Sequence, residues 1–243
     1  MCAVKYSNIN AIESLFECYS NQLDCNAQDL CGKTALSIAF QAKDIVAIKT
    51  LYKCWGNRLD INTHESNGRT ILMCIMCYNN NTNIIETLNK YWGNQIDVNA
   101  CDINGITSLM YTVLYDYSNV NEVITLLYKY WGDQININAS NSIGHTALSY
   151  AVRYSASNTI ELLYNYWGDQ IDINLRDTFG ETVLMHAAKR ADGVDSLTTL
   201  YKRYSGKFQL PIDQVNNQNK NILSMTTNPK HLELLLNNLL EYN

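Results

Sequence analysis

One short motif recurs through the sequence, and its spacing limits the folds that the chain can adopt. A glycine is followed two residues later by threonine and four residues later by leucine in CGKTAL, NGRTIL, NGITSL, IGHTAL and FGETVL. The glycines are Gly32, Gly68, Gly105, Gly144 and Gly180, at spacings of 36, 37, 39 and 36 residues, and a sixth, degenerate copy (NKNIL) has Asn219 at the same place. A period of this length is typical of small units that cannot bury an apolar face alone and must stack on their neighbours.

Each copy has the pattern of a turn followed by two helices. The segment before each glycine is rich in the turn formers Asn, Asp and Gly, and we call it the finger. Thr107 is placed to cap a first helix, TSLMYTVLY, through its hydroxyl group. Second helices are expected to begin at an Asn with Glu three residues later, a variant of the capping box, at Asn10 and Glu13, Asn83 and Glu86, Asn119 and Glu122, and Asn158 and Glu161. The sequence therefore predicts an all-α fold.

A second motif, built on Trp and Gly, recurs as CWGNRL, YWGNQI and twice as YWGDQI. We interpret it as the end of each second helix. The glycines that would close the helix in a left-handed conformation are Gly56, Gly93, Gly132 and Gly168. The rings that would then be buried between units are Trp55, Trp92, Trp131 and Trp167. The alternative is a strip of exposed indoles that serves a second partner.

The order D-x-N, then x-D-x-x-G-x-T-x-L, then a helix pair resembles the ankyrin repeat, most closely in DVNACDINGITSLM (97–110) and DINLRDTFGETVLMHAA (172–188). The resemblance implies an ankyrin-type solenoid of stacked helix-turn-helix repeats with protruding fingers. It covers nearly the whole chain, which we expect to be a single domain (1–243). We expect an N-terminal cap at 1–23, repeats at 24–59, 60–96, 97–135, 136–171 and 172–212, and a C-terminal cap at 213–243. These units are longer than the usual repeat of about 33 residues.

Composition excludes several classes of partner. The formal net charge is −5 and the sequence has no run of like charges, so we expect no nucleic acid partner. No stretch approaches the roughly 18 apolar residues of a membrane span, and the segment MCAVKYSNIN lacks the pattern of an export signal. We therefore expect no membrane association and a cytoplasmic location, in the producing cell or in a host cell.

Residues able to support chemistry are sparse. The string CIMC contains Cys74 and Cys77, a spacing that can hold zinc or run redox chemistry, but no second ligand pair accompanies it, which favours packing in a core. The four histidines, His64, His145, His186 and His231, fall in different units, and we expect His64 and His145 to be exposed near finger tips. No nucleophile and base pair or phosphate loop is recognisable. We expect no enzyme activity, no cofactor and no metal site.

The resemblance implies a concave binding surface made by the fingers and the exposed side of the first helices. Carried over position by position, the candidate partner-binding residues are Arg69, Tyr78, Ile103, Ile106, Tyr115, Ile143, His145, Arg153, Tyr154, Phe179, Glu181, Lys189 and Arg190. Apolar and tyrosine side chains in such positions favour an interface, since large amphipathic side chains dominate binding energies.

Three functions are compatible with these features. The first is a non-enzymatic protein–protein interaction module, which we expect to be a monomer that binds a protein of unknown identity. Free-standing ankyrin-like chains of this composition resemble those of large DNA viruses and intracellular bacteria, which implies a host protein as the partner. The second function is a substrate or decoy for asparaginyl hydroxylation at Asn99, Asn138 or Asn174. The third is a metal or redox regulator that uses the cysteines.

Overall fold

The fold is all-α, as the sequence predicts. The structure is a computed structural model, and it describes residues 1–77, 82–115, 118–154, 157–190, 193–204, 214–226 and 228–241, with side chains described up to residue 236. Within these ranges it contains helices and two isolated β-bridges, Cys101 with Thr107 and Arg176 with Thr182, but no strand. None of the helices in the described part combines the length and apolar character that crossing a lipid bilayer requires.

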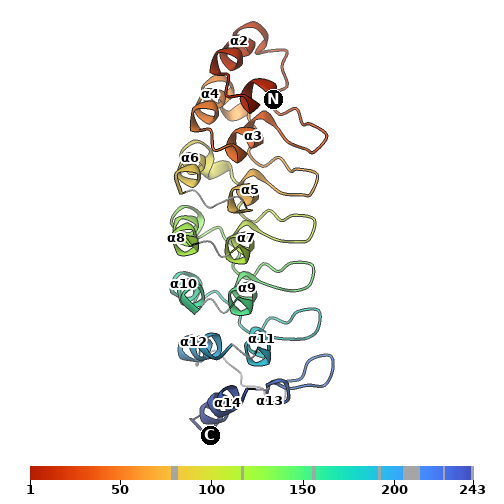
Figure 1. Cartoon of the computed structure of the whole chain (residues 1–243), viewed down its shortest axis with the longest axis vertical. Coiled ribbons are helices and arrows are strands. Elements are labelled where there is room, and N and C mark those ends of the chain that lie inside the picture. The colour runs from red at the N-terminus through yellow and green to blue at the C-terminus, as the bar shows by residue number, and fades with distance from the viewer. Residues whose placement is uncertain are drawn as a thin grey trace. The chain divides into compact units, whose positions relative to one another are not determined.

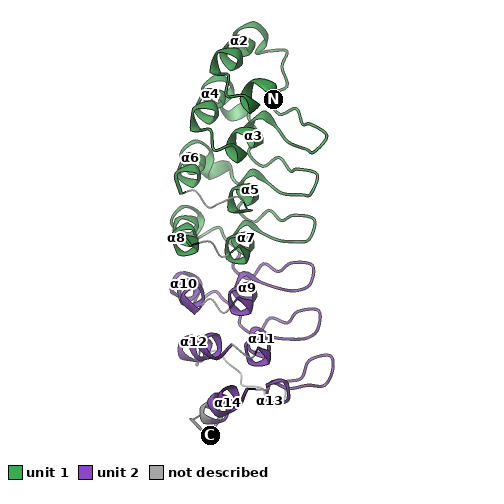
Figure 2. Cartoon of the chain, in the orientation of Figure 1, with its two compact units in different colours: residues 1–135 green, residues 136–243 purple. Residues whose placement is uncertain are grey.

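The chain divides into two compact units, residues 1–135 and 136–243 (Figure 2). The helices of the first unit are α1 (Cys2–Lys5), α2 (Ile9–Tyr19), α3 (Ala35–Gln41), α4 (Ile45–Trp55), α5 (Ile71–Cys77), α6 (Thr82–Trp92), α7 (Ser108–Leu114) and α8 (Val120–Trp131), with 3-10 turns η1 (Gly56–Arg58) and η2 (Gly93–Gln95). Those of the second are α9 (Ala147–Arg153), α10 (Ser157–Trp167), α11 (Val183–Lys189), α12 (Val194–Tyr204), α13 (Ile222–Met225) and α14 (Pro229–Glu241).

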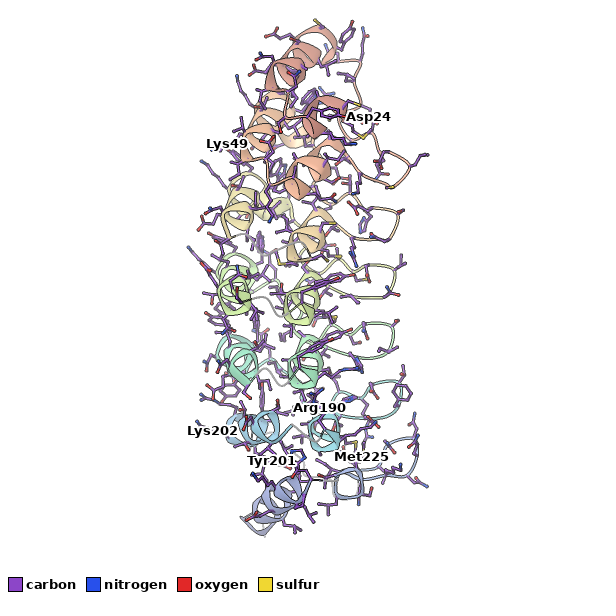
Figure 3. The ribbon with its side chains drawn as sticks, in the orientation of Figure 1. Asp24, Lys49, Arg190, Tyr201, Lys202 and Met225 are labelled. Carbon is purple, nitrogen blue, oxygen red and sulfur yellow. The ribbon has the colours of Figure 1, made fainter. Side chains whose placement is uncertain are left out.

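Within each unit the helices form two rows. In the first unit α3, α5 and α7 lie in one row and α4, α6 and α8 in the other, while the fingers project beside the first row (Figure 1). The second unit repeats this arrangement with α9, α11 and α13 against α10, α12 and α14 (Figure 1). Apolar side chains fill the space between the two rows (Figure 3). The segment expected from sequence to form the N-terminal cap, residues 1–23, holds two helices, α1 and α2.

Threonine starts the first helices, as expected for Thr107. Its hydroxyl oxygen accepts a hydrogen bond from the backbone N–H of Met110 at 3.4 Å. Three of the four predicted starts of second helices differ from the expectation, whereas Asn119 is the N-cap residue of α8 as predicted. Asn8, rather than Asn10, caps α2, and Asp44 caps α4. Asn83 and Asn158 lie inside α6 and α10, and α8 begins after Asn119 without a side-chain capping bond. The Asn and Glu pairs are therefore mostly residues of the first turn and not caps.

The tryptophan interpretation is confirmed, because all four rings are buried, from 1% exposure at Trp92 to 8% at Trp55. Trp92 packs edge to face against Tyr52 of the preceding repeat at 5.0 Å between ring centroids. Trp131 donates its indole N–H to the carbonyl oxygen of Gly93 at 2.9 Å. The rings thus join neighbouring second helices within the first unit.

The left-handed conformation predicted for the glycines after these tryptophans is wrong for three of the four. Gly56 has a φ of 50°, but Gly93, Gly132 and Gly168 do not have positive φ. The lack of space for a side chain explains why glycine occupies these positions. A Cβ atom on Gly132 or Gly168 would lie 2.5 Å from the carbonyl oxygen of Tyr128 or Tyr164, respectively.

The fingers of each unit are joined by their backbones. Ser66 donates its backbone N–H to Cys31 O at 2.9 Å in the first unit, and Thr178 donates to Ile143 O at 3.1 Å in the second. The finger glycines adopt φ from 73° to 85°, and Asn219 in the sixth copy adopts 58°. Asn tolerates this left-handed region, which explains why the degenerate copy still folds as a finger.

Asparagines also bridge neighbouring repeats, a role that the sequence did not reveal. Asn62 donates its side-chain amide to Gln95 O at 2.7 Å and accepts from the backbone N–H of Asp97 at 2.9 Å. Asn26 and Asn138 make the same pair of bonds in their own units. Each bridge satisfies two backbone groups at the exit of a second helix, where such groups otherwise lack partners.

Replacement of Gly68 by alanine tests the finger joint. Gly68 has a φ of 80°, and its Cβ would lie 2.7 Å from Ile103 N of the next finger. We expect Gly68→Ala to lower the free energy of unfolding by at least about 1–3 kcal/mol, measured by urea denaturation. Gly56→Ala is the control, because Gly56 has positive φ but nothing within 4 Å of its Cβ position. Equal losses in the two variants would show that contact with the next finger is unimportant.

Candidate functional site

A polar residue at the base of five of the fingers holds the turn. Asp102 Oδ1 accepts hydrogen bonds from the backbone N–H groups of Asn104 and Ile106, both at 2.9 Å. Four other side chains likewise accept hydrogen bonds from the backbone N–H groups of the residues two and four positions later. They are Asp29, Asn141, Asp177 and Asn216. We call these side chains the base residues. They fix the finger through its own backbone, as Asp and Asn do in Asx turns.

The second polar atom of the base residue reaches the first helix nine residues later. Asp102 Oδ2 accepts from the hydroxyl of Tyr111 at 2.6 Å. In the second unit, Asp177 Oδ2 lies 2.9 Å from His186 Nε2. In these two fingers the base residue therefore ties the finger to its own helix.

In the first unit, two of the predicted binding residues, Arg69 and Tyr115, contact Tyr111. Arg69 donates from Nε to the Tyr111 hydroxyl at 2.9 Å, and its guanidinium lies 4.8 Å from the centroid of that ring. Tyr115 stacks on Tyr111 at 6.0 Å and stays 40% exposed. Ile103 is 74% exposed, whereas Ile106 is half-buried. Burial raises the pKa of Tyr111, and the hydrogen bond to Asp102 adds to this, so its hydroxyl stays protonated as a donor.

In the second unit, seven of the predicted residues line one pocket of about 350 Å³, together with His186. The lining residues are Ile143, His145, Arg153, Phe179, Glu181, His186, Lys189 and Arg190. Arg190 follows the last residue of α11 (Figure 3) and donates a hydrogen bond to the carbonyl oxygen of Arg153. Tyr154 is 47% exposed at the end of α9 but does not line the pocket.

Two histidines and two carboxylates meet at this pocket. Asp177 Oδ2 lies 2.9 Å from His186 Nε2 and 3.5 Å from His145 Nε2. His186 Nδ1 lies 3.6 Å from Glu181 Oε2. Burial lowers the pKa of His145, and the neighbouring His186 and Arg153 lower it further, which favours the neutral imidazole.

His145 and Glu181 are less accessible than predicted for binding residues. His145 is 2% exposed and Glu181 is 5% exposed, and each directly follows a finger glycine. The expectation of a solvent-exposed His145 is therefore wrong, while His64 is exposed as expected. Tyr78 lies outside the described residues. Sequence reasoning missed Asp177 and His186 as neighbours of His145, although the nine-residue spacing of Asp177 and His186 matches that of Asp102 and Tyr111.

The CIMC cysteines are core residues. Cys74 and Cys77 are 2% and 6% exposed on α5. Burial raises the pKa of Cys74 to about 12 and that of Cys77 to about 11. A thiolate, the form that binds metals and attacks disulfides, is strongly disfavoured at both sites at neutral pH.

Alkylation tests this assignment. We expect iodoacetamide at pH 8 to modify the exposed thiols of Cys2, Cys18, Cys31 and Cys101 in the native protein while Cys74 and Cys77 stay unmodified. Peptide mass spectrometry after a short reaction gives the modified fraction at each site. Unfolding in urea should make all of them reactive. Rapid labelling of Cys74 or Cys77 in the native state would contradict their burial.

Comparison with known proteins agrees with the repeat geometry. Three overlapping segments, residues 1–100, 47–140 and 74–177, match a family model described as ankyrin repeats in three copies. These segments together span residues 1–177 of the 243. No curated protein sequence matches the chain significantly.

Solved structures share the fold at low sequence identity. The ankyrin repeat domain of Bcl-3, a member of the IkappaB protein family, is 17% identical with a TM-score of 0.77, covering 97% of this chain and 96% of that one. The ankyrin repeat protein EF0377 is 19% identical with a TM-score of 0.65, covering 86% and 97%. A chain from the complex of the predatory endopeptidase Bd0816 of Bdellovibrio bacteriovorus with immunity protein Bd3460 is 24% identical with a TM-score of 0.60, covering 83% and 95%. The sequence match and the repeated finger and helix pair show that the chain belongs to the ankyrin repeat family.

Proposed function

We propose that this chain is a non-enzymatic module that binds a protein partner through its fingers and first helices. Ankyrin repeats generally mediate protein–protein interaction. The observation that carries the proposal is the exposure of large apolar side chains at successive finger tips. Ile103 in the first unit and Ile143 and Phe179 in the second are 74%, 41% and 59% exposed, although their backbones are fixed. Rigid, exposed apolar side chains favour binding because little conformational entropy is lost on association.

The second-unit pocket indicates the chemistry of the partner. Ile143 and Phe179 supply an apolar rim, while Arg153, Lys189 and Arg190 supply positive charge. The Glu181 carboxylate offsets part of this charge, since Lys189 Nζ lies 3.2 Å from Glu181 Oε1. A segment that carries an apolar side chain next to an acidic one would fit both features.

The first unit offers a separate apolar and aromatic face. Ile103 and Tyr115 are exposed beside Arg69, which is held by Tyr111. Tyr and Arg are enriched at interface hot spots, because they combine contact area with a polar group. A partner long enough to contact both units would gain from two binding faces on one chain.

The proposed compartment is the cytoplasm of the producing cell or of a host cell. All eight cysteines are free thiols, and four of them are exposed, which suits a reducing environment. No sequence or structural feature of the described residues calls for catalysis, so the proposal assigns none.

Removal of the apolar rim tests the proposed function. We expect the double variant Ile143→Ala/Phe179→Ala to lose about 2 kcal/mol or more of binding free energy, which is more than tenfold in affinity. Partners would be captured from extracts of the native cell with immobilised wild-type protein and identified by quantitative mass spectrometry. Each candidate would then be purified and titrated against both proteins by calorimetry.

Val46→Ala is the matched control, since Val46 is 59% exposed on α4, far in sequence from the fingers of the second unit. It should bind as the wild type does. The same affinity in all three proteins would reject the pocket as the binding face. If affinity rises with added salt, the acidic character of the partner segment is rejected as well, because salt weakens attraction between opposite charges.

A further inference from the structure

Three sequence positions bring their side chains together at one finger junction in each unit. The positions are the residue after a finger glycine, the base residue of the next finger, and the helix residue nine positions after that base. In the first unit they hold Arg69, Asp102 and Tyr111, which form a hydrogen-bonded chain. We call such a set a junction triad.

The corresponding triad in the second unit is composed of metal-ligand residues. It contains His145, Asp177 and His186, and their ligand atoms all lie within 4.8 Å of one another. In the part of the chain that the structure describes, no other group of three His, Cys, Asp or Glu side chains converges in this way. The same backbone arrangement that holds a hydrogen-bonded chain in the first unit therefore presents two imidazoles and a carboxylate in the second.

The distances suit a small divalent ion. Zn²⁺ binds imidazole nitrogen and carboxylate oxygen at about 2.0–2.2 Å, so two ligands of a tetrahedral site lie roughly 3.3 Å apart. Asp177 Oδ2 lies 2.9 Å from His186 Nε2 and 3.5 Å from His145 Nε2. The separation from His186 is shorter than that value, and the separation from His145 is longer. The three ligand atoms lie within 4.8 Å of one another, so the two imidazoles must approach each other by up to about 1.5 Å to complete three corners of a tetrahedron.

The surroundings also suit a metal site. Metal-bound histidines usually donate their other ring N–H to a carboxylate, which fixes the orientation of the ring. His186 Nδ1 faces Glu181 Oε2 at 3.6 Å, and Glu181 is itself held by Lys189 at 3.2 Å and by the side-chain amide of Asn216 at 3.1 Å. Both His145 and His186 line the 350 Å³ pocket, which gives an ion an entry path and leaves room for water as the fourth ligand.

From this geometry we infer that His145, Asp177 and His186 bind one Zn²⁺ ion, with water in the fourth position and Glu181 orienting His186. Two imidazoles and a carboxylate form a set of nitrogen and oxygen ligands typical of zinc. Three cations, Arg153, Lys189 and Arg190, also line the pocket and oppose a divalent ion. The affinity is therefore lower than at closed structural zinc sites. This inference is independent of the proposed partner binding.

The first unit supplies the variants for the test. His186→Tyr introduces a tyrosine at position 186, which corresponds to Tyr111 in the first unit. The tyrosine hydroxyl can still donate a hydrogen bond to Asp177. The double variant His145→Arg/His186→Tyr rebuilds the Arg69, Asp102 and Tyr111 triad in the second unit. Both remove imidazole ligands and preserve the contacts of a finger junction that the chain already uses. Glu181→Gln changes the orienting group alone.

The full chain would be titrated with Zn²⁺ by calorimetry and with Co²⁺ by visible absorption. We expect the wild type to bind one equivalent, the double variant to bind none at this site, and Glu181→Gln to bind about 10–100-fold more weakly. Co²⁺ should give the visible bands of a tetrahedral site without the near-ultraviolet charge-transfer band of thiolate ligands. That band would instead place the ion on cysteine and overturn the assignment. One-equivalent binding by the double variant, or no binding by the wild type, would overturn it as well.

A measurement on the wild type alone guards against a variant that fails to fold. Nitrogen NMR of the imidazole side chains should show Zn²⁺-dependent shifts for His145 and His186 and none for His64 and His231. His64 is exposed on another finger, and His231 is buried with Nδ1 3.1 Å from Ala188 O. Shifts confined to His64 or His231, or unchanged His145 and His186 signals, would reject the site.

Discussion

The fingers depend on a close approach between one backbone and the next, and this approach requires a residue with no side chain. A Cβ atom on Gly144 would lie 2.5 Å from Asp177 Cα, nearer than two such atoms can come. The backbone bond from Thr178 to Ile143 O forms at this same contact. Positive φ adds a second reason for glycine, since L-residues with a side chain pay about 1–2 kcal/mol there. The base residues, the junction triads and the pocket are all positioned by this contact.

The sequence predicted the repeated framework well because the features that specify it are local. A glycine at positive φ, a threonine at a helix start and an apolar stripe each act within a few residues, so each recurs visibly with the period. Burial of the tryptophans followed from the same logic and is confirmed. The helix caps were less predictable. Asn and Glu are common throughout a first turn, and the pairing of Asn10 with Glu13 did not distinguish the cap, Asn8, from its neighbours.

The candidate site was predictable only in part. Seven of its lining residues were identified by position, but the proximity of His145 to His186 arises from two different fingers and a helix. No residue close to either histidine in the sequence indicates that the other histidine lies nearby. The exposure of His145 was also misjudged, because a residue next to a finger glycine can point outward or under the next finger. Phe179, directly before Gly180, is 59% exposed, whereas His145, directly after Gly144, is 2% exposed. The exposure of such a residue therefore depends on the neighbouring repeat that packs against it.

The asparagine bridges have a consequence for how such a chain can change in length. Asn62 bonds to the carbonyl oxygen of Gln95 at the end of its own repeat and to the N–H of Asp97 in the following repeat, and both are main-chain groups that every residue except proline offers. The joint therefore does not depend on the identity of the side chains at Gln95 and Asp97. A unit that is copied by gene duplication and inserted beside its parent would therefore form the same two hydrogen bonds at both of its boundaries. The side chains of the junction triads would then be free to diverge, and one framework could carry arginine and tyrosine at one junction and two histidines at another.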